Sequence, residues 1–423
     1  WTLAMRGQTT ATTIDLGGNK LTLKGGGLLL GQETDSITWT ISNGTITAGV
    51  LDAASDLFIH HANFSGTNRL VDISAVIADN GTGALRLIKS SGDTGASSMT
   101  LSGVNTYTGG TVLNLGTLVL GATGRLGTGG IVVNRATLTQ TAGGIIPAQA
   151  LTLNASSTVT LAGNNSLTGL TFGNAGGAAP TLTPTGVLTL TGGITSTTSN
   201  PGTIATIGSG TLDLNGAAAY SINVGASLVN GIDVAPWQAG LSISSIVQNG
   251  GITKSGNGVL QLSGQSTFAG GVNVTAGALI IGADGSPTIG TPVSGPVGVG
   301  TLTMATNTRL GASGAYAIAN NVVFGDVGAG TGSHVFTGVN NLTLNGVTTL
   351  PAIWNVEIVA PQMTLTIADA TPSLSSDVIN KSGLGTLIFG NYAGTLQATG
   401  GLVFAADGNA RGTFENVSLG GDL

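Results

Sequence analysis

The chain has 423 residues with 72 glycines, no cysteine, 7% charged residues and a formal net charge of −6. The lack of cysteine excludes disulfides and thiolate metal sites, and the twelve lysines and arginines form no basic stripe of the kind that nucleic acids require. A mean hydropathy of +0.38 excludes a disordered glycine-rich linker. The longest apolar runs nevertheless span only five residues, far below the ~20 of a membrane-spanning helix. We therefore expect a buried core and no membrane span.

Residues 1–50 predict short strands. Apolar residues alternate with threonine or serine and are separated by Gly-Gly, Gly-Gln or Asn-Gly, as at residues 14–16, 21–23, 28–30 and 39–41. Alternation broken by such turn residues is typical of half-buried strands. No stretch has a 3.6-residue apolar period, and glycine disfavours helix. We therefore expect essentially no α-helix.

Residues 51–98 are the most polar segment, and we expect them to include a protruding loop. The segment contains the one cluster with the chemistry for metal binding or proton transfer, made of Asp52, Asp56, His60 and His61. Adjacent residues on a strand point to opposite faces, so the two histidines cannot share a site unless they lie on a turn. We therefore interpret the cluster as a solvated loop and predict no metal site.

From residue 101 a period of 20 residues is measurable. An asparagine closes a short apolar strand at each step, namely Asn114, Asn134, Asn154 and Asn174. A second series of short apolar segments begins at residues 302, 322, 342 and 363. A turn residue that recurs at a fixed step means that the chain returns to the same corner. Asparagine tolerates the left-handed conformation there, and its stacked side chains are expected to form a hydrogen-bonded ladder.

This period predicts an all-β fold, a parallel β-helix or β-solenoid with coils of about 20 residues. We expect residues 1–423 to form a single continuous solenoid. Each coil would contribute two or three short strands that pair in parallel with their copies above and below. Because parallel crossovers are overwhelmingly right-handed, we expect a right-handed coil. Leucine, valine, isoleucine and phenylalanine would point inward, and threonine, serine and asparagine outward.

Residues 101–121 and 262–282 nearly repeat each other. The shared positions include an aromatic residue and a glycine pair, which are Tyr107, Gly109 and Gly110 in the first copy and Phe268, Gly270 and Gly271 in the second. The phrase Lys-Ser-Gly-x-Gly-x-Leu occurs at residues 254–260 and 381–387, and a version with an insertion begins at Lys89. We interpret this phrase as a boundary between coils.

These stretches resemble the autotransporter-associated β-strand repeat, also called the passenger-associated transport repeat. Repeat units are recognisable at 88–130 and 252–300, and in degenerate form at 379–395, where residues 391–394 replace the aromatic and the glycine pair. The resemblance implies a right-handed β-helical passenger of an exported bacterial protein, located outside the cell or on its surface. It also implies a translocator domain, which we do not recognise in residues 1–423. We expect that domain to be removed, to lie downstream or to be replaced by another export route.

Other candidates for chemistry are few. Glu33 and Asp35 could be a carboxylate pair of the glycosidase type, but they lie in a predicted turn without a second polar cluster. The tryptophans would suit a sugar-stacking platform if exposed, but their irregular spacing favours separate packing roles; they are Trp1, Trp39, Trp237 and Trp354. There is no Gly/Asp nonapeptide array for calcium. We therefore predict no catalytic residue and no cofactor.

The sequence thus favours a non-enzymatic extracellular structural protein, a rod or fibre segment of a bacterial surface adhesin or passenger. We expect its partners to be further repeats of the same chain or a second copy that stacks end to end into filaments, and we expect no nucleic acid partner. One alternative is a β-helical polysaccharide-active enzyme, which needs several charged groups that converge on one face. The other is a glycan-binding surface module, which needs exposed tryptophans.

Overall fold

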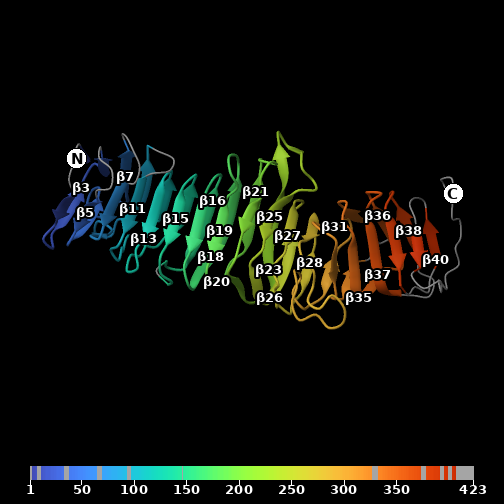
Figure 1. The fold of residues 1–423 in the computed structure, drawn as a ribbon. Coiled ribbons are helices and arrows are strands. Elements are labelled where there is room, and N and C mark those ends of the chain that lie inside the picture. Colours follow the sequence, from blue (N-terminus) through green and yellow to red (C-terminus); the bar gives the residue numbers. More distant parts are fainter. Residues whose placement is uncertain are drawn as a thin grey trace. The chain divides into compact units, whose positions relative to one another are not determined.

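The computed structural model describes residues 2–6, 11–32, 38–63, 69–92, 97–144, 146–325, 332–372, 378–390, 395–398 and 403–405. They belong to two compact units, the first made of residues 1–192 and 208–211 and the second of residues 193–207 and 212–423. In each unit, short strands lie side by side in long sheets (Figure 1). The part of the chain that the structure describes contains no α-helix, and so no candidate for a membrane-spanning helix.

The first unit has two long sheets and a small one. The first sheet contains, in spatial order, β1 (Thr2–Arg6), β4 (Gly27–Gln32), β7 (Ser55–Asn63), β10 (Leu85–Ser91), β12 (Thr111–Asn114), β14 (Ile131–Asn134), β16 (Gln149–Asn154), β18 (Asn165–Asn174) and β20 (Val187–Leu190). The second sheet contains β2 (Thr12–Asp15), β5 (Thr38–Ser42), β8 (Arg69–Ile73), β11 (Ser97–Leu101), β13 (Thr117–Leu120), β15 (Thr137–Gln140), β17 (Thr158–Leu161) and β19 (Thr181–Pro184). The small sheet contains β3 (Lys20–Leu23), β6 (Thr45–Ala48) and β9 (Val76–Ile77).

The second unit also has two long sheets. Its first sheet contains β21 (Ile194–Thr198), β23 (Thr211–Val229), β26 (Ile246–Ser255), β28 (Val272–Val274), β30 (Leu302–Met304), β32 (Tyr316–Ile318), β33 (Val322–Phe324), β35 (Leu342–Leu350), β37 (Thr364–Pro372), β39 (Thr386–Phe389) and β41 (Val403–Ala405). Its second sheet contains β22 (Ala205–Ile207), β25 (Ala239–Ile243), β27 (Val259–Leu262), β29 (Ala278–Ile281), β31 (Arg309–Ala312), β34 (His334–Thr337), β36 (Ile353–Ile358), β38 (Val378–Ser382) and β40 (Thr395–Ala398). The short strand β24 (Ile232–Asp233) folds back antiparallel on the end of β23.

Successive coils pair in parallel and in register. Thr111 lies opposite Ile131, which lies opposite Leu151, so that equivalent residues stack coil on coil. This pairing confirms the predicted parallel β-solenoid. The coil length is 20 residues at these steps, but longer coils hold extra residues in their turns. Val272, for example, lies opposite Leu302, 30 residues later.

The second predicted series does not mark one corner of the solenoid. Leu302 does pair with Val322 across a 20-residue coil, but Val322 pairs next with Thr348, whereas Leu342 pairs with Tyr316. Both pairings are possible because β35 is long and shifts its register between its two halves. The step from residue 322 to residue 342 therefore reflects similar strand sequences at different positions of the coil, whereas Leu342 pairs with Leu365, two residues beyond the expected Met363.

The core consists of inward-facing rows of aliphatic side chains. In β15, Leu138 is fully buried, while Thr137 and Thr139 on either side of it face outward and are half-buried. Full burial of such a leucine contributes about 1.5–3 kcal/mol. Because each coil adds its own inward residues to the row, the apolar core grows with every coil that is stacked.

Candidate functional site

An asparagine ladder marks one corner of the first unit. The Nδ2 of Asn134 donates to the Oδ1 of Asn114 at 2.8 Å, and the Nδ2 of Asn154 donates to the Oδ1 of Asn134 at 2.8 Å. The left-handed residues are not the asparagines but the residues that follow them, with φ of 65° at Leu115 and 52° at Arg135. The asparagine is therefore favoured for its side-chain hydrogen bonds. The prediction that it adopts the left-handed backbone conformation is wrong.

Asn174 lies outside this ladder, which corrects the predicted fourth step. Asn154 pairs with Gly173, so Asn174 is displaced by one residue. A one-residue shift turns a side chain to the opposite face of a strand, and Asn174 is buried, with 1% of its surface exposed. A Cβ at position 173 would overlap the Oδ1 of Asn154. Glycine at that position therefore leaves space for the last asparagine of the ladder.

Three lysines of the repeated Lys-Ser phrase are fully buried: Lys89, Lys254 and Lys381. The Nζ of Lys254 donates to three carbonyl oxygens, of Ser255 at 3.1 Å and Gly256 at 2.5 Å in its own turn and of Ala276 at 2.8 Å in the next coil. These bonds use all three donors of an ammonium group. Burial, followed by the charge of Arg309, lowers the pKa of Lys254 to about 7.

The other two lysines also donate to backbone carbonyls of turns, Lys89 to the next coil and Lys381 to its own turn. The Nζ of Lys89 donates to the carbonyl of Leu115 in the next coil at 3.0 Å, and that of Lys381 donates to Ser382 at 3.2 Å and Gly383 at 2.7 Å. Burial lowers the pKa of Lys89 and of Lys381 to about 8. Lys381 lies in the second sheet of its unit, whereas Lys89 and Lys254 lie in first sheets. The Lys-Ser phrase therefore forms a turn whose carbonyls are capped by a buried lysine, and this turn occurs after strands of either sheet.

A glycine faces each of the first two lysines. Gly116 and Gly277 have φ of 69° and 72°, and a Cβ at either position would overlap the Nζ of Lys89 or Lys254. A left-handed φ alone favours glycine. Here the absent side chain also provides the space that the ammonium group occupies.

The aromatic residue and glycine pair of both repeats hold adjacent coils together. Tyr107 is fully buried, and its hydroxyl lies 2.7 Å from the Oγ1 of Thr111; burial raises its pKa to about 12. Phe268 is buried at the matching position. A Cβ at Gly109 or Gly270 would lie 2.6–2.7 Å from the backbone of the preceding coil. The second glycines, Gly110 and Gly271, have φ of 92° and 70°.

Both stretches match one family model, described as the passenger-associated-transport-repeat, over residues 93–120 and 252–281. The chain carries two passenger-associated transport repeats. No curated protein matches the chain. The passenger-associated transport repeat is a structural repeat family and not an enzyme family, and it is found in autotransporter passengers, which are secreted or lie on the cell surface. The degenerate third unit at 379–395 is not part of the match, and its residues 391–394 lie outside the described residues.

The polar cluster of residues 51–98 lies on strands and turns of the first unit. Asp56 and Arg86 form an ion pair between neighbouring coils, with 2.9 Å between the carboxylate Oδ1 and Nε. His60 Nδ1 lies 2.9 Å from Ser90 Oγ, while His61 points the opposite way and is fully buried. The two histidines therefore do not share a site. Among the described residues no three His, Asp or Glu side chains gather as a metal site would require.

The described tryptophans differ in their exposure to solvent. Trp39 and Trp354 are fully buried, and the Nε1 of Trp354 donates to His334 Nδ1 at 3.2 Å. Trp237 is 48% exposed, and the guanidinium carbon of Arg309 lies 4.9 Å from the centroid of its ring. Trp1, Glu33 and Asp35 lie outside the described residues.

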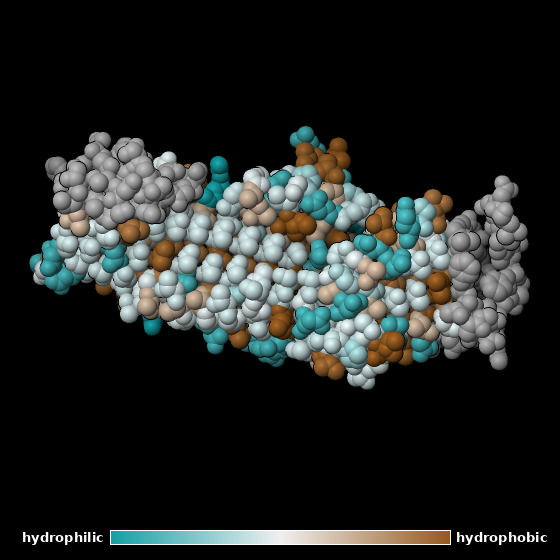
Figure 2. All heavy atoms as spheres, in the orientation of Figure 1, coloured by the Kyte–Doolittle hydropathy of each residue, from teal (hydrophilic) through white to brown (hydrophobic). Residues whose placement is uncertain are grey.

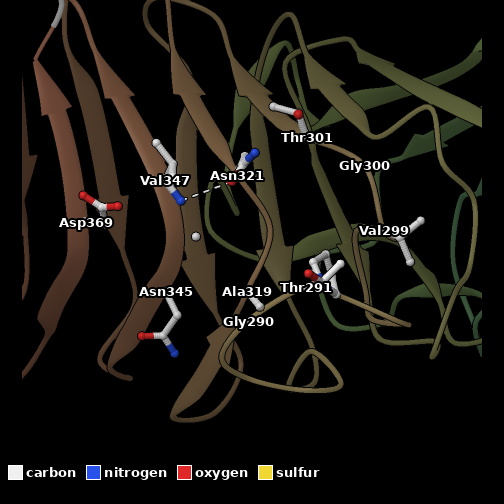
Figure 3. A pocket seen from close by; sticks show the side chains of 12 residues that line it. Gly290, Thr291, Val299, Gly300, Thr301, Ala319, Asn321, Asn345, Val347 and Asp369 are labelled. Carbon is white, nitrogen blue, oxygen red and sulfur yellow. Dashed lines mark hydrogen bonds between the residues drawn. The ribbon is translucent and has the colours of Figure 1, made fainter.

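The second unit has a pocket of about 420 Å³ between the residue 290–301 segment and residues of β35 and β37 and the turn before β33 (Figure 3). Two of its polar side chains fix the local backbone. Asn321 Oδ1 accepts from the Val347 amide at 3.1 Å, and Asn345 Nδ2 donates to the Thr288 carbonyl at 2.7 Å. Asp369 is exposed at its rim. A glycosidase needs two carboxyl groups, one as the acid and one as the base or nucleophile. This pocket has the single carboxylate of Asp369, and its two asparagine side chains are hydrogen-bonded to the backbone.

Proposed function

We propose that the chain is a structural, non-enzymatic segment of a bacterial surface passenger, forming part of the stalk of an adhesin or of a fibre. One observation supports this most directly: the residues that define its repeats act between coils. Lys254 caps turns of two coils, Phe268 is buried, and Gly270 closely approaches the preceding coil. These residues are used in stacking and are therefore not available for chemistry on a substrate.

The same stacking supports a proposal about partners. In the described part of the chain, β1 pairs with β4 and β2 pairs with β5, each on one side. An open strand edge accepts another strand, so we propose that further repeats of the same chain or a second copy add there. Electron microscopy of the purified chain over a range of concentrations tests this, with filaments as the expected result. Particles that stay short and separate at every concentration would contradict self-association.

The absence of enzymatic activity needs its own test. We expect no depolymerisation when the chain is incubated with a panel of bacterial and plant polysaccharides. Asp56 is the best-placed acid for a comparison variant, because its partner Arg86 holds it at the surface. Turnover by the wild-type chain that is abolished in Asp56→Ala would overturn the structural proposal in favour of a polysaccharide-active enzyme.

A second candidate function, binding of surface glycans, is favoured by the exposed indole of Trp237. Sugars stack on aromatic faces, and a neighbouring guanidinium can donate to their hydroxyls. A glycan array with the wild-type chain and Trp237→Ala tests this function. Ile232→Ala is the matched control, since Ile232 is 67% exposed near Trp237 in sequence. Binding that is absent, or equal in both variants, would reject this candidate.

A further inference from the structure

The outer surface of the second sheet in the first unit carries a regular array, which we call the threonine face. Its two columns run across β11, β13, β15, β17 and β19 in continuous register. One column is Ser98, Thr117, Thr137, Thr158 and Thr181, and the other is Thr100, Val119, Thr139, Thr160 and Thr183. Eight of the ten positions are therefore threonine.

The spacing of this array is set by the backbone. Neighbouring strands of a sheet lie about 4.8 Å apart, and alternate residues along a parallel strand lie about 6.6 Å apart. The five strands keep one register without a bulge, whereas the first sheet of the same coils shifts register between β16 and β18. The threonine face is thus a two-dimensional lattice. It extends about 19 Å across the five stacked strands and about 6.6 Å along each strand, from the first column to the second.

The support below this lattice is rigid. The inward residues between the two columns are Met99, Leu118, Leu138, Val159 and Leu182, all fully buried. Threonine is branched at Cβ and has few rotamers in a strand. A surface that is already ordered loses little conformational entropy when it binds an ordered partner.

The hydroxyls of the threonine face are available for a partner. Within the described residues, Thr181 alone among them bonds to the protein, through a 3.4 Å contact of its Oγ1 with the Ala179 carbonyl. The surrounding chain is nearly uncharged, because residues 136–253 contain no lysine or arginine and only two acids, Asp213 and Asp233. Figure 2 shows a largely pale surface over β13, β15 and β19, neither strongly hydrophilic nor strongly hydrophobic.

We propose that the threonine face binds ice. An ice surface is an uncharged lattice of water whose oxygens repeat at distances comparable to these two spacings, and each threonine offers it a hydroxyl that donates and accepts beside a methyl group. A protein that recognises a soluble sugar or peptide needs a concave site with convergent groups. A flat, neutral and periodic face instead matches a flat, neutral and periodic partner. This inference does not depend on the stalk function.

Partition of the full chain into slowly growing ice tests the proposal. The double variant Thr160→Lys/Thr183→Lys places two charged side chains on the threonine face. Its matched control is Thr152→Lys/Thr171→Lys, which places the same charges on outward positions of β16 and β18, in the first sheet of the same coils. Circular dichroism and thermal melting establish that both variants fold.

We expect the wild-type chain and the control to enter the ice, and the Thr160→Lys/Thr183→Lys chain to enter it at least about tenfold less, as for loss of central contacts in an interface. Exclusion of the wild-type chain from ice to the level of serum albumin would overturn the proposal. Equal partition of the two double variants would also overturn it. If the chain is excluded from ice but binds crystalline cellulose or chitin through the same threonines, the lattice it recognises is a polysaccharide and the proposal is wrong.

Discussion

The Nζ of Lys254 lies 2.8 Å from the carbonyl oxygen of Ala276, which belongs to the turn of the following coil. A strand residue of one coil thus caps the backbone of the next. Lys89 and Leu115 repeat this relationship in the first unit at 3.0 Å. Coil stacking in this protein therefore relies on hydrogen bonds from buried lysine amino groups at the corners as well as on apolar burial.

Removal of the Lys254 ammonium should destabilise the chain. Lys254→Met keeps much of the side-chain volume but leaves buried turn carbonyls without their donor, which costs about 1–3 kcal/mol. Urea denaturation monitored by circular dichroism measures the change in the free energy of unfolding. Lys24→Met, at an exposed lysine, should change it by no more than about 0.5 kcal/mol. Equal effects of the two substitutions would show that the buried hydrogen bonds contribute nothing.

The contribution of Lys254 should increase with pH. Its folded pKa of about 7 lies below its ordinary value of 10.5 because burial disfavours the charged form. Between these two values the unfolded chain binds a proton that the folded chain lacks, so a rise in pH stabilises the folded state. The difference in unfolding free energy between wild type and Lys254→Met should therefore grow from about pH 7 to about pH 9.5. A difference that shrinks over this range would contradict the lowered pKa.

Gly277→Ala should destabilise the chain through two separable effects. The left-handed φ of 72° costs about 1–2 kcal/mol with any side chain, and the new Cβ would also collide with Lys254 and adjacent carbonyls. Overpacking of this kind adds about 1–3 kcal/mol. Gly231→Ala isolates the first effect, because Gly231 has a φ of 79° and open space around it. The melting temperature should therefore fall further for Gly277→Ala than for Gly231→Ala, and the reverse order would exclude the collision.

The asparagine ladder should be most sensitive at its centre. Asn134 both donates to Asn114 and accepts from Asn154, whereas each outer asparagine takes part in one of these two bonds. A net hydrogen bond contributes about 1 kcal/mol. Asn134→Ala should therefore reduce the unfolding free energy about twice as much as Asn114→Ala or Asn154→Ala in the same urea titration. Three equal losses would indicate that the asparagines act singly.

The local pattern of the sequence was sufficient to predict the class of fold. Alternation of apolar and polar residues defines strands, and glycine and asparagine define turns, because both are properties of a few neighbouring residues. The recurrence of Asn114, Asn134 and Asn154 in 20-residue steps indicated parallel coils, and the motif around Tyr107 and Phe268 indicated the repeat family. All of these signals can be read from the residue types and their spacing along the chain.

The tertiary structure decided how the coils align. Equal spacing in sequence stacked Asn134 on Asn154, but one register shift turned Asn174 inward, and Val322 met Thr348 in place of the equally spaced Leu342. The register between two coils depends on the number of residues in each turn. Turns vary in length because their residues do not take part in the strand pairing. For the same reason only the folded chain shows that the repeated lysines are buried caps and that threonines from five coils form one lattice.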